Sequence, residues 1–130
     1  MRQPTIFYAE DDLDDLYLFQ LAFERVPDIR IRHFSNGAEL LEALAATPEA
    51  ELPRLIVLDL NMPQLDGRET LALLRQNAGY AAIPVLLFTT SNSVEDRSFA
   101  KQWNVDFLTK PILFEDLEAL AVQLGDRCRF

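Results

Sequence analysis

Short apolar runs alternate along the chain with longer stretches of helical period. Residues 6–9, 55–58 and 85–88 are continuously apolar, and each run stops at a polar or charged residue, a pattern typical of strands buried on both faces. Residues 106–109 are predicted to form a shorter strand. Residues 29–32 alternate apolar and charged side chains, as an edge strand with one solvated face does. We therefore predict five strands.

Helical periodicity fills the segments between these strands. Leu16, Phe19, Phe23 and Val26 fall on one helical face, and Pro27 ends that helix. A helix is also predicted after each of the four remaining strands. Strict alternation of strand and helix favours a parallel sheet covered by helices on both faces. The predicted fold class is α/β: a flavodoxin-like (βα)5 doubly wound parallel sheet with strand order 2-1-3-4-5.

Polar residues at two of the helix starts indicate caps. Asn36 with Glu39 three residues later resembles a capping box. Ser93 with Asp96 is predicted to cap the helix that follows the fourth strand.

Composition and charge narrow the classes of function. The 130 residues are 49% hydrophobic and 25% charged, as in one packed domain, so we expect a single domain over 1–130. Acidic residues outnumber basic ones 21 to 12, and the formal charge of -9 repels nucleic acid and anionic lipid. The apolar runs are too short to span a bilayer, and the start lacks a signal-peptide pattern. We expect a cytoplasmic protein without nucleic-acid or membrane partners.

Four residues outside the predicted strands are assigned no chemistry. Tyr17 and Trp103 are expected to pack in the core. His33 has no partner at metal-ligand spacing and is expected to be structural or solvent-exposed. The single cysteine, Cys128, is expected to lie in a frayed terminus without a disulfide partner.

Chemistry-bearing residues close four of the predicted strands. Glu10 and Asp11 follow the first strand, Asp59 the third, Thr89 closes the fourth and Lys110 follows the fifth. The carboxyl ends of parallel strands meet at one edge, so these side chains are expected to converge. Three clustered carboxylates repel one another, and Mg²⁺ relieves that repulsion. The set fits phosphoryl transfer to Asp59, with Mg²⁺ and Lys110 neutralising the added charge and Thr89 donating a hydrogen bond.

Four motifs together resemble the receiver domain of two-component response regulators. They are Ile6-Phe7-Tyr8-Ala9-Glu10-Asp11-Asp12, Leu58-Asp59-Leu60-Asn61-Met62-Pro63 with Asp66-Gly67, Phe88-Thr89-Thr90, and Thr109-Lys110-Pro111. The resemblance covers residues 6–124, and the motifs stand in the family's order. A finer resemblance is to the stand-alone receivers that partner bacterial phytochromes. It is carried by Asp66-Gly67-Arg68-Glu69, Thr89-Thr90-Ser91 and Thr109-Lys110-Pro111.

The resemblance implies a role for each residue that closes a strand. It implies that Asp59 is phosphorylated and that Asp11 and Asp59 bind Mg²⁺ directly. Glu10 acts through a metal-bound water, and the main-chain carbonyl of Asn61 is a further ligand. The acidic run also allows the pair Asp11 and Asp12. We favour Glu10 and Asp11 because they directly follow the four apolar residues.

The same resemblance implies a switch and its partners. Thr89 and Lys110 hold the phosphoryl oxygens, Phe107 takes the place of the aromatic switch residue, and the Lys110-Pro111 bond is cis. The phosphoryl donor is a sensor histidine kinase or a histidine phosphotransfer protein. The signal leaves through a face of the fourth helix, fifth strand and fifth helix, toward a downstream protein or in a homodimer. Val94, Phe99 and Phe114 are candidate apolar residues there.

Other functions fit the sequence less well. An aspartyl-nucleophile phosphatase of the haloacid-dehalogenase type needs a second aspartate two residues after the first, where this chain has Asn61. The short chain also leaves no room for its cap domain or for an output domain. A flavodoxin would suffer repulsion between the carboxylates and the flavin phosphate. A non-phosphorylated binding receiver would be odd with the complete set of residues. We therefore expect a phosphoacceptor that catalyses only its own phosphorylation and dephosphorylation, and not an enzyme.

Overall fold

The structure is a computed structural model that describes residues 3–129. Its strands are β1 (Thr5–Ala9), β2 (Arg30–Phe34), β3 (Leu55–Leu58), β4 (Val85–Thr89) and β5 (Asp106–Thr109). Its α-helices are α1 (Leu13–Ala22), α2 (Gly37–Ala45), α3 (Gly67–Gln76), α4 (Val94–Gln102) and α5 (Phe114–Cys128). Short 3₁₀ helices η1 (Phe23–Arg25) and η2 (Glu49–Glu51) follow α1 and α2. Within residues 3–129, the predicted five strands and five helices are confirmed.

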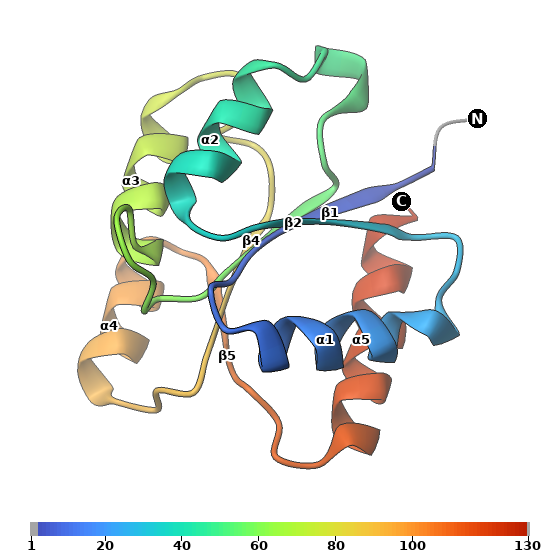
Figure 1. Ribbon diagram of the computed structural model, residues 1–130. Coiled ribbons are helices and arrows are strands. Elements are labelled where there is room, and N and C mark those ends of the chain that lie inside the picture. Colours follow the sequence, from blue (N-terminus) through green and yellow to red (C-terminus); the bar gives the residue numbers. More distant parts are fainter. Residues whose placement is uncertain (1–2, 130) are drawn as a thin grey trace.

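The strands form one parallel sheet in the order β2-β1-β3-β4-β5, which confirms the predicted topology. β2 lies at an edge of the sheet, as its alternating pattern indicated. It ends later than predicted because its pairing with β1 continues until Phe34 lies opposite Ala9. The carboxyl ends of all five strands meet at one edge, where the loops to the helices begin (Figure 1).

Helices cover both faces of the sheet, with α1 and α5 on one side and α2, α3 and α4 on the other (Figure 1). Ile6 and Tyr8 of β1 pack into the core beneath α1 and α5. Phe7 and Ala9 pack into the core beneath α2 and α3. Because both faces are covered, the whole run 6–9 is buried, which is why it is continuously apolar.

An aromatic cluster fixes α1 below the carboxyl edge of the sheet. The ring centroid of Phe19 lies 4.2 Å from that of Tyr8, 4.8 Å from that of Phe23 and 6.0 Å from that of Phe88. Burying each such side chain contributes about 1.5–3 kcal/mol to folding. The cluster therefore holds α1, β1 and β4 in the positions from which their polar residues reach the edge.

The two caps expected from the sequence differ in outcome. The Ser93 hydroxyl accepts a hydrogen bond from the Asp96 amide at 3.1 Å, which confirms that cap. The Asn36 side chain accepts from the Glu39 amide at 2.9 Å. The Glu39 carboxylate, however, accepts from the amide of Ser35 at 3.0 Å and not from that of Asn36. Asn36 therefore caps the helix, but the return hydrogen bond of a capping box goes to the amide of Ser35 instead of that of Asn36.

Three expectations from the sequence are wrong. The Lys110–Pro111 peptide bond is trans, the isomer that such bonds prefer by about 0.5–1 kcal/mol. Tyr17 is 62% exposed, because it lies on the outward face of α1, away from Phe19. Cys128 is buried, since α5 continues to this residue and packs it into the core. Trp103, by contrast, packs against the core beneath α2 and α3, as expected.

Candidate functional site

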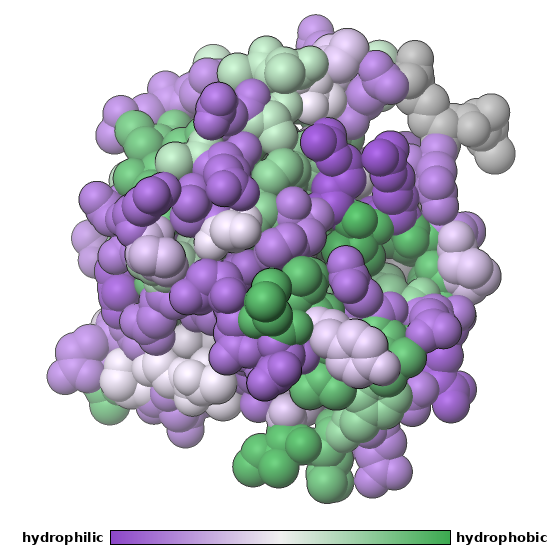
Figure 2. Space-filling view, viewed as in Figure 1, coloured by the Kyte–Doolittle hydropathy of each residue, from purple (hydrophilic) through white to green (hydrophobic). Residues whose placement is uncertain are grey.

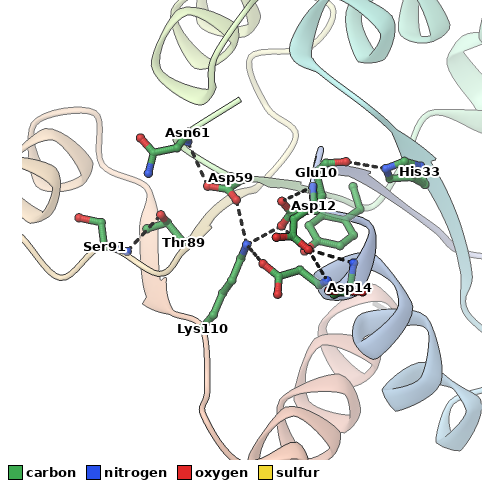
Figure 3. Close-up of polar contacts among 11 residues, drawn as sticks. Glu10, Asp12, Asp14, His33, Asp59, Asn61, Thr89, Ser91 and Lys110 are labelled. Atoms are coloured by element: carbon green, nitrogen blue, oxygen red, sulfur yellow. Dashed lines mark hydrogen bonds and ion pairs between the residues drawn. The ribbon is translucent and has the colours of Figure 1, made fainter. Parts of the chain in front are cut away.

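Lys110 lies at the centre of a group of carboxylates at the carboxyl edge of the sheet (Figure 3). Its Nζ donates hydrogen bonds to Glu10 Oε1 at 2.5 Å, to Asp15 Oδ2 at 2.7 Å and to Asp59 Oδ2 at 2.8 Å. Glu10 follows β1, Asp59 follows β3 and Lys110 follows β5, so the strand order brings these three side chains together.

Asp15 was not singled out in the sequence. It is one of the acidic residues in the first turn of α1, where the helix dipole also favours a carboxylate. Its contact with Lys110 spans 95 residues of sequence. No local spacing could have separated Asp15 from its neighbours, since only the packing of α1 against the sheet aims it at the lysine.

Glu10 is fully buried, and both its carboxylate and its main-chain carbonyl accept hydrogen bonds. The Tyr8 hydroxyl donates to Glu10 Oε1 at 2.8 Å, and His33 Nε2 donates to the Glu10 main-chain carbonyl at 2.6 Å. Burial raises the pKa of Glu10 to about 7, although the hydrogen bond from Lys110 opposes this rise, and the Asp59 carboxylate adds to it. His33 therefore has the structural role that the sequence allowed.

The charge of Lys110 is stabilised by its partners. Burial by itself would lower the pKa of this amine. The hydrogen bonds to Asp15, Asp59 and Glu10 outweigh burial, and the pKa lies above its ordinary value. Lys110 is thus a fixed positive charge beside Asp59.

A metal ion could be held by three carboxylates at this edge. Glu10, Asp11 and Asp59 each offer one oxygen, and these oxygens all lie within 4.8 Å of one another. Asp11 is exposed, so the group of three carboxylates is open to solvent at this residue. Such hard oxygen donors fit Mg²⁺ or a similar divalent cation. Asp12 instead caps α1, with its Oδ1 accepting from the amides of Asp14 and Asp15 at 2.9 and 3.0 Å.

A hollow of about 620 Å³ opens over these carboxylates. Its lining comprises Glu10, Asp11, Asp12, Leu13, Asp14, Asp15, Asp59, Asn61, Thr90 and Lys110. The Asn61 amide donates to Asp59 Oδ1 at 3.0 Å and so orients that carboxylate. Asp59 lies between Lys110, which bonds one of its carboxylate oxygens, and the Asn61 amide, which bonds the other (Figure 3).

The expected switch residues lie on neighbouring strands, with Thr89 at the end of β4 and Phe107 on β5. Thr89 is fully buried, and its hydroxyl accepts a hydrogen bond from the Ser91 amide at 3.3 Å. Phe107 is half-buried on β5, with the Arg97 guanidinium 5.3 Å from its ring centroid. The Thr89 hydroxyl is thus bonded to the β4–α4 loop. The contact between Lys110 and Asp59 does not involve this hydroxyl.

Gly67 permits α3 to begin directly beside Asp59. A Cβ atom at position 67 would lie 2.4 Å from the main-chain oxygen of Asp59, which is closer than atoms approach without a shift. Asp66 and Glu69 form a complete capping box at the same helix start. The Asp66-Gly67 motif therefore fixes the loop that carries Asp59 and Asn61.

A polar network that the sequence did not reveal joins α3 to α4. Arg68 forms an ion pair with Asp96, whose other carboxylate oxygen accepts from the Ser91 hydroxyl at 2.5 Å. Asp96 is buried, and the Ser91 hydrogen bond, with help from Arg68, keeps its pKa below the ordinary value. The network thus ties the loop after Thr89 to both helices.

The fold and this acidic edge define a signalling domain of the two-component class. The chain belongs to the family of response regulator receiver domains, whose model matches residues 6–122. It is a receiver domain of a two-component response regulator, and such domains are phosphoacceptors that interact with histidine kinases and downstream effectors. This confirms the family that the four sequence motifs indicated.

Several relatives are similar over most of the chain. The probable methanogenesis regulatory protein FilR2 of Methanothrix harundinacea is 36% identical, over 93% of this chain and 81% of its own. The phosphorylated cyanobacterial phytochrome response regulator RcpA has a TM-score of 0.86 at 28% identity, covering 98% of this chain and 95% of its own. The Mn²⁺-bound form of response regulator Rcp1 has a TM-score of 0.81 at 31% identity, covering 95% and 92%. Within residues 3–129 no helix is long and apolar enough to cross a membrane.

Proposed function

We propose that Asp59 accepts a phosphoryl group from the phosphohistidine of a sensor histidine kinase or a histidine phosphotransfer protein. The observation that carries this proposal is the 2.8 Å contact between Asp59 and the Lys110 ammonium, at the floor of an acidic hollow that is open to solvent. A carboxylate held beside a fixed positive charge is placed to bear a dianionic phosphoryl group. Because phosphohistidine is made with ATP, the proposal includes a cytoplasmic location.

In the transfer, an oxygen of Asp59 forms a bond to phosphorus while the bond from phosphorus to the histidine nitrogen breaks. The electron pair of that bond stays on the histidine nitrogen. Lys110 exchanges a carboxylate oxygen for a phosphoryl oxygen and neutralises the incoming charge. Its contact with Asp59 already places it for this exchange, so positioning supplies most of the rate.

Mg²⁺ is the proposed cofactor, held directly by Asp11, Asp59 and the main-chain carbonyl of Asn61, and through a water by Glu10. The carboxylate oxygens within 4.8 Å of one another support this choice, as does the Mn²⁺-bound form of the similar Rcp1. When bound, the ion would neutralise part of the charge on the phosphoryl oxygens.

Turnover is proposed to be limited to the domain's own acyl phosphate. An aspartyl phosphatase needs a second carboxylate two residues after the nucleophile to move protons, and Asn61 cannot supply one. Water can still reach the phosphorus through the hollow, so the phosphorylated form decays at a moderate rate. The domain therefore acts as a timed switch.

The output of the switch is proposed to pass through α4, β5 and α5. The Thr89 hydroxyl leaves the Ser91 amide to bond the phosphoryl group, and Phe107 moves into the space beside β5. Of the apolar residues expected on this face, Val94 is 75% exposed. Phe99 and Phe114 are half-buried against the two cores and offer only their edges to a downstream protein or a second copy.

Acetyl phosphate with and without Mg²⁺, followed by intact-mass measurement, tests the acceptor. The parent protein should gain one phosphoryl mass only with Mg²⁺, and Asp59→Asn should gain none. Asp14→Asn is the matched control, because Asp14 lines the same hollow without contacting Lys110. Equal uptake by Asp59→Asn and the parent would overturn the assignment.

A further inference from the structure

A second hollow lies at the opposite end of the sheet from Asp59. Its volume is about 370 Å³, within the range of small-molecule sites. Pro4 and Thr5 at the start of β1, Arg30 at the start of β2 and Arg54 just before β3 line it, together with the α2–β3 connection that contains η2. Figure 2 shows strongly hydrophilic side chains gathered between this connection and the β2 edge. The hollow shares no residue with the one over Asp59.

Three arginines converge on this hollow although the chain is strongly acidic. Arg30 and Arg32 lie two positions apart on β2, opposite Thr5 and Phe7, so both project from the same face of the sheet. Arg54 also lines the hollow. The described lining residues contain three guanidinium groups against one carboxylate, that of Glu51, in a chain whose formal charge is -9. The hollow is therefore a local positive site.

Arg30 and Arg32 have no anionic partner in the part of the chain that the structure describes, residues 3–129. This sets them apart from the arginines elsewhere that pair with carboxylates, namely Arg25, Arg68, Arg127 and Arg129. Arg32 is half-buried, whereas Arg30 is exposed. A half-buried cation without a counterion is costly, and an anion bound at Arg32 would remove that cost.

The local structure holds two of these groups in place. The Arg32 guanidinium lies 5.1 Å from the ring centroid of Phe7 and 5.4 Å from that of Phe34. These contacts orient the guanidinium but use none of its N–H donors. Arg54 Nη1 donates to the main-chain carbonyl of Cys128 at 3.1 Å, which anchors this side chain to the end of α5. Donors fixed before binding lose little entropy when an anion arrives.

We propose that this hollow binds a small organic phosphate, such as a nucleotide or another metabolite that carries a phosphate or pyrophosphate group. The guanidinium fork matches the geometry of phosphate oxygens, and three such groups suit an anion of two or more charges. The volume admits a small molecule, and the net charge of the chain disfavours a nucleic acid strand. The site is separate from Asp59, so it does not rest on the proposed phosphorylation.

Amide chemical shifts test this site in metal-free buffer with a chelator, at constant ionic strength. The probes are sodium pyrophosphate and ATP, with sodium chloride as the reference anion. Saturable shifts are expected at residues 5–7, 30–32 and 46–52, and not around Asp59. Saturation by pyrophosphate alone would show that the phosphate groups suffice, and tighter binding of ATP would show that the nucleoside also contributes.

Arginine variants separate a built site from general attraction of anions. Arg32→Gln should weaken binding by at least about tenfold, and so should Arg30→Gln, which alters an exposed side chain and should leave the fold intact. Arg127→Gln removes the same charge from α5, outside the hollow, and should leave binding unchanged. Shifts that chloride reproduces, or an equal loss in Arg127→Gln, would overturn the proposal.

Discussion

Arg68 at the start of α3 forms an ion pair with Asp96 in the first turn of α4, and the same carboxylate accepts a hydrogen bond from Ser91. Arg68 and Asp96 are 28 residues apart in the sequence. The Arg68 guanidinium also lies 5.7 Å from the ring centroid of Phe99. The start of α4 is therefore held by α3 and by the loop that follows Thr89, next to the proposed phosphorylation site.

Removing the buried partner of this ion pair should destabilise the domain. Asp96→Ala is expected to lower the free energy of unfolding by about 1.5–3 kcal/mol, because it removes charge-assisted hydrogen bonds at a buried position. Urea unfolding measures the change. Asp106→Ala is the control, since Asp106 pairs with Arg127 at the surface and should cost less than about 1 kcal/mol. Equal losses for the two variants would contradict a special role of the Asp96 network.

The pH dependence of stability should reveal the lowered pKa of Asp96. The unfolded chain binds a proton at this residue near pH 3.9, whereas the folded protein binds it only at lower pH. The stabilisation is therefore complete above the unfolded pKa and is lost as the pH falls through the folded pKa. Unfolding free energies of Asp96→Asn and the parent should differ most at pH 5 to 7 and converge at acid pH. A constant difference would show that the charge of Asp96 does not stabilise the fold.

Two single substitutions decide which acidic residues bind Mg²⁺. Asp11→Asn should weaken Mg²⁺ binding by at least about tenfold, because it removes a proposed ligand. Asp12→Asn should change the affinity little, since Asp12 caps α1 and asparagine caps a helix about equally well. Amide-shift titrations with Mg²⁺ give both affinities. The opposite ranking would move the metal pair to Asp11 and Asp12.

Lys110 should matter more for phosphorylation than Thr89. Lys110→Met should slow uptake from acetyl phosphate by roughly 10²-fold, as it removes the fixed charge beside the phosphoryl group. Thr89→Ala should slow it by less than about tenfold, the value of one neutral hydrogen bond. Mass spectrometry over time gives the rates, and Lys110→Arg, which keeps the charge, controls for disruption of the carboxylate group. Equal rates for Lys110→Met and Thr89→Ala would contradict this ranking.

Thr89 should instead be needed to transmit the signal. Amide shifts recorded with a beryllofluoride mimic should change in α4 and β5 of the parent, because the hydroxyl of Thr89 would leave the Ser91 amide. Thr89→Ala should still bind the mimic at Asp59 but show a weaker response in α4 and β5. A full response in the variant would remove Thr89 from the path between the site and the surface.

The sequence by itself determined the order of elements and the edge where the site lies. The apolar runs 6–9 and 55–58 predicted strands covered on both faces, and alternation with helices favoured a parallel sheet. Strand order then placed Glu10, Asp59 and Lys110 at one edge. These features follow from periodicity and connectivity, which local sequence records directly.

The tertiary structure alone decided which side chains meet. The bonds from Lys110 to Asp15 and from Asp96 to Arg68, and the turn of Thr89 toward Ser91, depend on how helices pack and which rotamers fit. The gathering of Arg30, Arg32 and Arg54 at the far end of the sheet depends on the path of the α2–β3 connection. Each such contact joins elements whose relative position is set by the whole core. No short stretch of sequence carries that information, because it resides in the packing of distant segments.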